Sequence, residues 1–96
     1  MKIRAVESPQ EEAQGMKRWA FFCPGCKCGH QICTGTGQWT FDGDMEKPTI
    51  NPSVLCYEIP EAKIPRCHSF VRAGVIQFLS DCSHELAGKT VPLEDF

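Results

Sequence analysis

The eight residues at positions 23–30, CPGCKCGH, include three cysteines and one histidine. Zinc prefers thiolate and imidazole ligands and takes four of them in tetrahedral geometry. Cys23 and Cys26 have the C-x2-C spacing that brings two thiolates together across a tight turn. The intervening Pro24 and Gly25 are residues that favour such a turn. Cys23 and Cys26 are therefore expected to supply one half of a Zn2+ site.

The second half of this site must come from a distant segment, and the stretch 67–80, CHSFVRAGVIQFLS, is the best candidate. Its two β-rich runs flank Ala73-Gly74, a two-residue hairpin signal. In that register Cys67 faces Ser80, and Cys82 is the next position on the same face of the ribbon. We therefore predict a metal site of Cys23, Cys26, Cys67 and Cys82. His84 is the first alternative for the fourth ligand, and Cys28 and His30 are further substitutes.

Other uses of the seven cysteines are less favoured by the sequence. An odd number of cysteines fits poorly with complete disulfide pairing, and no amphipathic helix follows the CxxC as it would in a thioredoxin-like redox motif. Cys33 and Cys56 fall in predicted strands and are interpreted as small apolar residues. A site with four cysteine ligands would be closed and structural, and would support a domain too small to be stable by its core alone.

Composition and charge restrict the classes of protein to which this chain can belong. Its 96 residues predict a single domain, with residues 1–14 as an edge strand and a flexible loop. The formal net charge is −2 and no basic stripe is present, which argues against nucleic-acid binding. No apolar run reaches transmembrane length, and the N-terminus lacks the apolar segment of a signal peptide. We therefore expect a cytoplasmic protein that does not bind membranes, and the sequence leaves its oligomeric state open.

The predicted elements are short and almost all extended. Strands are expected at 2–6, 16–22, 31–35 and 38–42, with CPGCKCGH at the tip of a hairpin. The three prolines of KPTINPSVLCYEIP predict an extended segment that cannot be a central strand throughout. Residues 81–88 are expected to form one helical turn, and 89–93 a last extended piece. The predicted fold class is a small, mostly-β, zinc-stabilised and loop-rich single domain.

A few residues outside the metal site have types suited to catalysis. Ser53 follows Pro52 in a stiff segment that could hold a nucleophile in place. His68 follows Cys67, so in a strand it points away from the metal and is a candidate general base. Asp81 and His84 would share one face of a helical turn and could support that base. Each of these residues also has an ordinary structural interpretation, because no specific catalytic motif surrounds it.

Three stretches of the chain resemble a small family of phage and prophage proteins: FFCPGCKCGH, WTFDGDMEKPTINPSVL and CHSFVRAGVIQFLSDCSHELAGKTVPL. The resemblance covers residues 20–93. Members of this family are often mislabelled as ammonia monooxygenases. Related domains are similar to proteins encoded beside bacterial ubiquitin-like modifiers, which are suspected peptidases. The family pattern falls on Cys23, Cys26, His30, Trp39, Pro52, Ser53, Cys67, His68, Asp81, Cys82 and His84. This chain departs from the pattern in carrying Cys28, which could take the place of Cys82.

The resemblance implies a zinc-stabilised fold, a phage or prophage origin, and a hydrolase that acts on a ubiquitin-like modifier or its conjugates. In that reading Ser53 is the nucleophile, His68 is the general base, and Asp81 or His84 supports the base. In a metal variant of the mechanism, a water bound to zinc attacks the substrate in place of the serine. The alternative is a non-enzymatic module that presents loops 42–53 and 57–66 to a host or phage protein. Its candidate aromatic anchors are Trp19, Trp39, Phe41 and Tyr57.

Overall fold

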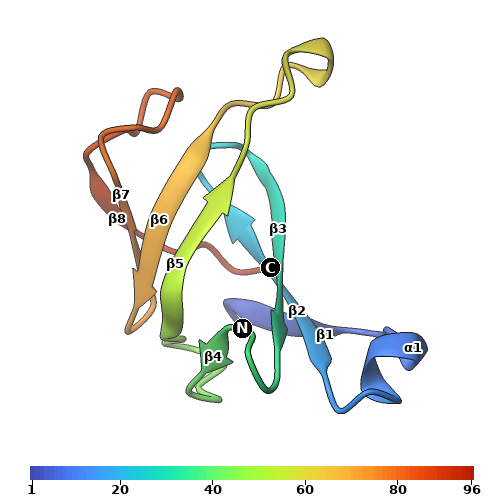
Figure 1. Ribbon diagram of the computed structural model, residues 1–96. Helices are drawn as coiled ribbons and strands as arrows, with labels where there is room; N and C mark the ends of the chain where they lie inside the picture. The colour runs from blue at the N-terminus through green and yellow to red at the C-terminus, as the bar shows by residue number, and fades with distance from the viewer.

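The computed structural model describes residues 1–96 as two antiparallel sheets that share one core (Figure 1). The three-stranded sheet has the order β1-β2-β3, with bounds Ile3–Val6, Lys17–Cys23 and Cys28–Thr34. The five-stranded sheet has the order β4-β5-β6-β7-β8, with bounds Thr40–Phe41, Ile50–Cys56, Cys67–Arg72, Val75–Phe78 and Thr90–Pro92. The expected small, mostly-β fold class is confirmed.

The core lies between the sheets and takes apolar side chains from both of them. The twelve buried residues of this core are Ile3, Phe21, Cys23, Ile32, Ile50, Val54, Cys67, Val71, Ile76, Phe78, Cys82 and Leu93. Along β6 the buried residues Cys67, Ser69 and Val71 alternate with more exposed ones, as a strand with one face on the core requires. His68 therefore lies on the outer face of the five-stranded sheet.

The β6–β7 hairpin has the predicted register. Ser69 pairs with Phe78 and Arg72 with Val75, around the turn at Ala73-Gly74. Ala73 and Gly74 have positive φ angles of 49° and 82°, the backbone conformation of a tight two-residue hairpin turn. The ladder ends at the Ser69–Phe78 pair, and beyond it the chain leaves the regular strand.

Two other segments differ from the expected elements. β3 begins at Cys28, earlier than predicted, because the turn needs only residues 24–27 and Lys27 adopts a left-handed φ of 58°. Residues 81–88 form turns and no helix. Both differences lie next to predicted metal ligands, so they affect which of these side chains can come together.

The helical segments are short and peripheral. The four-residue helix α1, Pro9–Glu12, falls within the expected N-terminal loop, and the 3-10 turn η1, Pro60–Ala62, lies in the loop that projects from the body in Figure 1. Arg18 donates two hydrogen bonds of 2.7 Å to the Glu11 carboxylate and ties α1 to β2. None of the helices has the length or the apolar composition that a membrane crossing requires.

Candidate active site and metal centre

An irregularity in β5 sets the position of Ser53. Ile50 pairs with Val71 and Val54 pairs with Ser69, so the register shifts between them. A bulge of this kind accommodates Pro52, which lacks an N–H for the ladder, and re-aims the neighbouring side chains. β5 is therefore an interior strand, between β4 and β6, whose ladder is interrupted at the proline.

The bulge brings Ser53 to His68 on the neighbouring strand. His68 pairs with Leu55 in the β5–β6 ladder, so Ser53 is its diagonal neighbour. The Ser53 Oγ lies 3.0 Å from the His68 Nε2. This separation is within the range expected for a nucleophile and its general base.

Asp81 approaches the same imidazole from the opposite side. Its Oδ2 lies 3.1 Å from the His68 Nδ1. The turn that follows β7 produces this contact, because the Leu79 N–H donates to the His68 carbonyl and keeps the chain beside β6. Ser53, His68 and Asp81 thus form a continuous chain of hydrogen-bonding groups from three separate segments. About a quarter of the His68 side chain is exposed (24%), so a substrate can reach the group.

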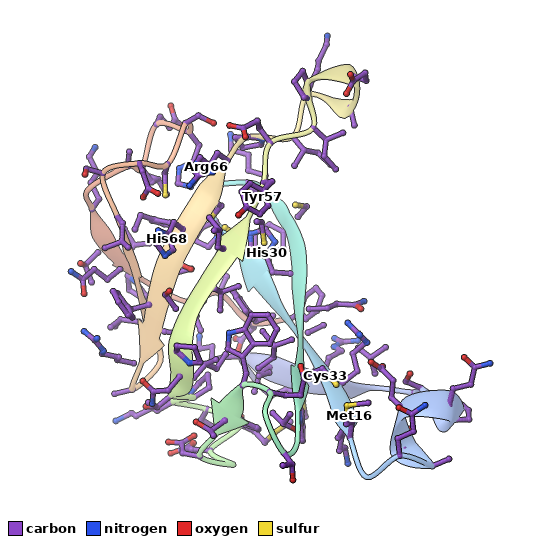
Figure 2. The ribbon with its side chains drawn as sticks, in the orientation of Figure 1. Met16, His30, Cys33, Tyr57, Arg66 and His68 are labelled. Carbon is purple, nitrogen blue, oxygen red and sulfur yellow. The ribbon has the colours of Figure 1, made fainter.

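Arg66 is a fourth member of this constellation, and sequence reasoning missed it. Its Nη2 donates at 3.3 Å to the Asp81 Oδ2, the oxygen that also faces His68. Figure 2 shows Arg66 near the end of β6 from which His68 projects. The pKa of Asp81 is lowered from its usual value, because hydrogen bonds from His68 and Arg66 outweigh the opposing effect of desolvation. Arg66 therefore helps keep Asp81 ionised. No spacing rule marks an arginine beside a cysteine in this role.

On the inner side of β6, four potential metal ligands converge. The ligand atoms of Cys23, Cys26, Cys67 and His84 all lie within 4.8 Å of one another. The Cys26 N–H donates to the Cys23 sulfur at 3.3 Å, a contact that holds the knuckle closed. Three thiols and one imidazole from three separate segments match the ligand set of a structural zinc site.

His84 has an unsatisfied polar atom that a metal ion would satisfy. Its Nε2 is buried and has no hydrogen-bond partner, which is costly for a polar atom away from water. The Leu86 backbone nitrogen lies 3.2 Å from Nδ1, and the ring packs edge-on against Phe78 with centroids 4.5 Å apart. These contacts orient the imidazole within the thiol cluster.

The fourth member of this cluster differs from the predicted one, because His84 and not Cys82 lies with the other three. The Cys82 sulfur instead accepts from the His68 N–H at 3.2 Å and donates to the His68 carbonyl at 3.3 Å. The prediction of Cys82 extended strand alternation past Phe78, whereas the chain turns after that residue. The same turn separates Asp81 from His84, so His84 lies with the thiols and does not support His68.

The charge state of the thiols also favours a bound cation. The hydrogen bond with Cys67 lowers the pKa of Cys23 to about 4, despite burial. Burial and the Cys23 charge raise the pKa of Cys26 to about 12, and the bond to Cys23 raises that of Cys67. Without a cation, one thiolate suppresses ionisation of the other two. A divalent ion would stabilise all three thiolates together.

The remaining candidate ligands lie outside this group. His30 is buried beside the cluster, with its Nδ1 3.5 Å from the Cys56 sulfur and no partner for its Nε2. Burial opposes protonation of His30, but the neighbouring sulfurs of Cys23 and Cys56 raise its pKa to about 10. Cys28 pairs with Cys23 across the hairpin without joining the four. Cys33 is buried, as expected of a small apolar residue.

Gly25 gives a direct test of the cluster. A Cβ at this position would overlap the His84 imidazole, so we expect Gly25→Ala to displace the ring. The variant should bind zinc more weakly and lose about 1–3 kcal/mol of stability, as overpacked sites do. Metal content and thermal melts would measure both effects.

Gly29→Ala is the matched control, because a Cβ there meets its nearest neighbour, Phe96, at an ordinary 3.4 Å. If Gly25→Ala bound zinc as tightly as the control, His84 would not be a ligand.

Comparison with known proteins places this chain in a family. The model of the family described as bacterial ubiquitination-like system serine protease (BubE) matches residues 3–79. This range includes Ser53, His68 and the three cysteines of the cluster, whereas Asp81 and His84 follow it. No curated protein and no solved structure matches the chain. Because the match spans well over half of its length, the chain belongs to the BubE family of serine proteases of bacterial ubiquitination-like systems.

Proposed function

We propose that this chain is a serine protease that cleaves a ubiquitin-like modifier or its conjugates, with Ser53, His68 and Asp81 as its catalytic triad. The observation that carries the proposal is the 3.0 Å and 3.1 Å pair of contacts that His68 makes with Ser53 and Asp81. Membership of the BubE family supports a protein substrate from a ubiquitin-like system. The phage or prophage origin stays a prediction.

The geometry supports the usual division of roles in a triad. The Ser53 Oγ attacks the scissile carbonyl while the His68 Nε2 takes its proton. Asp81 accepts from the His68 Nδ1–H, which selects the required tautomer and stabilises the imidazolium that forms. The imidazolium then protonates the leaving amine, and the acyl group remains on Ser53. Water, deprotonated by His68, hydrolyses that ester and regenerates the serine.

The metal belongs to the framework in this proposal. Cys23, Cys26, Cys67 and His84 would hold Zn2+, which would supply structural cross-linking between the two sheets. Because all four ligands come from the protein, such a site is closed and has no open position for an activated water. Cys67 directly precedes His68, and His84 follows Asp81 by three residues, so the framework fixes the base and its support. The serine mechanism is therefore preferred over the metal variant.

The alternative function, a protein-binding module, has one feature in its favour. Tyr57 and Ile59, in the loop that follows β5, are 67% and 48% exposed. By contrast, Trp19, Trp39 and Phe41 pack partly against the core. An exposed aromatic and an aliphatic side chain on a projecting loop suit contact with a protein, which a modifier protease also needs.

A fluorophosphonate probe tests the proposed function directly, because it forms a covalent bond only with an activated serine. We expect one adduct per chain, on Ser53, located by mass spectrometry of the zinc-loaded protein. Ser69→Ala should label equally well, because Ser69 is fully buried on the inner face of β6. A folded, metal-loaded chain without an adduct at Ser53 would contradict the serine mechanism.

A further inference from the structure

A pocket of about 540 Å³ lies next to the residue that precedes the proposed nucleophile. It is lined by Gly37, Gln38, Trp39 and Pro52. Two segments build it, because Pro52 belongs to β5 and the other three residues belong to the loop between β3 and β4. Pro52 directly precedes Ser53, so one wall of the pocket adjoins the triad. The proposed mechanism does not itself use this pocket.

Trp39 connects the pocket to Ser53. Its indole Nε1–H donates to the Ser53 carbonyl at 3.2 Å, and its backbone N–H donates to the Cys33 carbonyl at 3.1 Å. One side of the residue packs against the core while the residue also lines the pocket. The indole is thus held in a defined orientation against the backbone of Ser53.

The walls define the chemistry of an occupant. An indole, a prolyl ring, a glycine and a neutral amide line the pocket, and no charged residue is among them. A charged side chain placed there would lose hydration without gaining an ionic partner. An apolar side chain would instead bury surface against the indole and the ring.

We propose that this pocket is the primary specificity subsite, and that it takes the uncharged, apolar side chain of a substrate residue adjoining the cleaved bond. This inference rests on the proposed protease function, because the pocket is linked to Ser53 through the Trp39 hydrogen bond to the Ser53 carbonyl and through Pro52, the preceding residue. Gln38 is the specificity-determining residue that can be altered most cleanly. It is exposed, and it is one residue removed from the hydrogen bond between Trp39 and Ser53.

Introducing a negative or a positive charge at Gln38 tests the subsite. Fusion substrates would carry Leu, Lys or Glu at each of the two positions that adjoin the cleaved bond. The wild type should prefer Leu. Gln38→Glu should raise kcat/KM about 10-fold for the Lys substrate, and Gln38→Lys should do the same for the Glu substrate, as expected for a pocket contact. Thr36→Glu is the control, because Thr36 is exposed on the same loop but does not line the pocket.

A binding measurement separates recognition from turnover. Trp19 and Trp39 are the only tryptophans, so a Trp19→Phe, Ser53→Ala chain reports on Trp39 alone. Its fluorescence should shift when the Leu peptide is added, and not with the Lys or Glu peptide.

The outcomes distinguish this inference from the function on which it rests. If the wild type labels at Ser53 and cleaves, but the Gln38 variants behave like Thr36→Glu, only the subsite is wrong. Equal preference for Leu, Lys and Glu at both positions would also overturn the subsite. If Ser53 is not labelled in the folded wild type, the protease function fails and the subsite fails with it.

Discussion

Ser53→Ala is expected to reduce kcat for substrate cleavage by about 10⁴–10⁶-fold while leaving the fold intact. Removing the nucleophile of a triad abolishes the covalent route, and only the residual effect of binding and electrostatics remains. The fold should persist because Ser53 is only partly buried and its Oγ hydrogen-bonds to the His68 ring, which is itself partly exposed. Cleavage of a modifier fusion, followed with purified zinc-loaded protein, measures the loss.

The other members of the triad should behave as one unit with Ser53. His68→Ala should cost about as much as Ser53→Ala, and Asp81→Asn should cost about 10⁴-fold through the wrong imidazole tautomer. The triple variant should be no slower than the single ones, because these residues act together. Ser69→Ala is the control: Ser69 lies on β6 one residue from His68 but is buried in the core, so this variant should keep full activity. Additive losses, or a Ser53→Ala variant that still turns over, would exclude this mechanism.

Removal of the metal should have a large effect on the free energy of unfolding. We expect one Zn2+ per chain, bound by Cys23, Cys26, Cys67 and His84. Structural zinc contributes about 10–16 kcal/mol in small zinc domains, which matches the whole stability of a typical domain, about 5–15 kcal/mol. A chelator should therefore unfold this chain at room temperature, as a thermal melt or circular dichroism would show.

The pH dependence of zinc binding has a definite sign. The pKa of Cys26 is raised to about 12 and that of Cys67 is also raised, so both are thiols in the metal-free chain at neutral pH. Zinc must displace their protons, so its affinity should rise with pH and fall in acid. Proton release on titration with zinc at two pH values measures this linkage.

Variants separate the ligands from the other cysteines. Cys67→Ser should lose both the metal and the cooperative melt. Cys28→Ser should keep one Zn2+ per chain, because Cys28 lies outside the four-residue group. A metal-free chain that melts like the zinc-loaded one would show that the cluster does not support the fold.

Local patterns in the sequence were sufficient for several features. The fold class, the C-x2-C knuckle and the register of the β6–β7 hairpin depend on turn residues and on the two-residue period of strands. The same period placed Cys67 on the inner face and His68 on the outer face of one strand. Turn preferences and strand alternation depend only on residues close together in the chain, so they can be read from a single sequence.

Tertiary structure alone decided which residues complete each site. His84 replaces Cys82 beside the thiols because the ladder ends at Ser69–Phe78, after which strand alternation no longer applies. The bulge at Pro52 brings Ser53 to His68, and the Arg66–Asp81 contact joins two segments fifteen residues apart in sequence. Such convergence depends on where a regular element stops and on how the chain packs after it. No local spacing rule encodes that information.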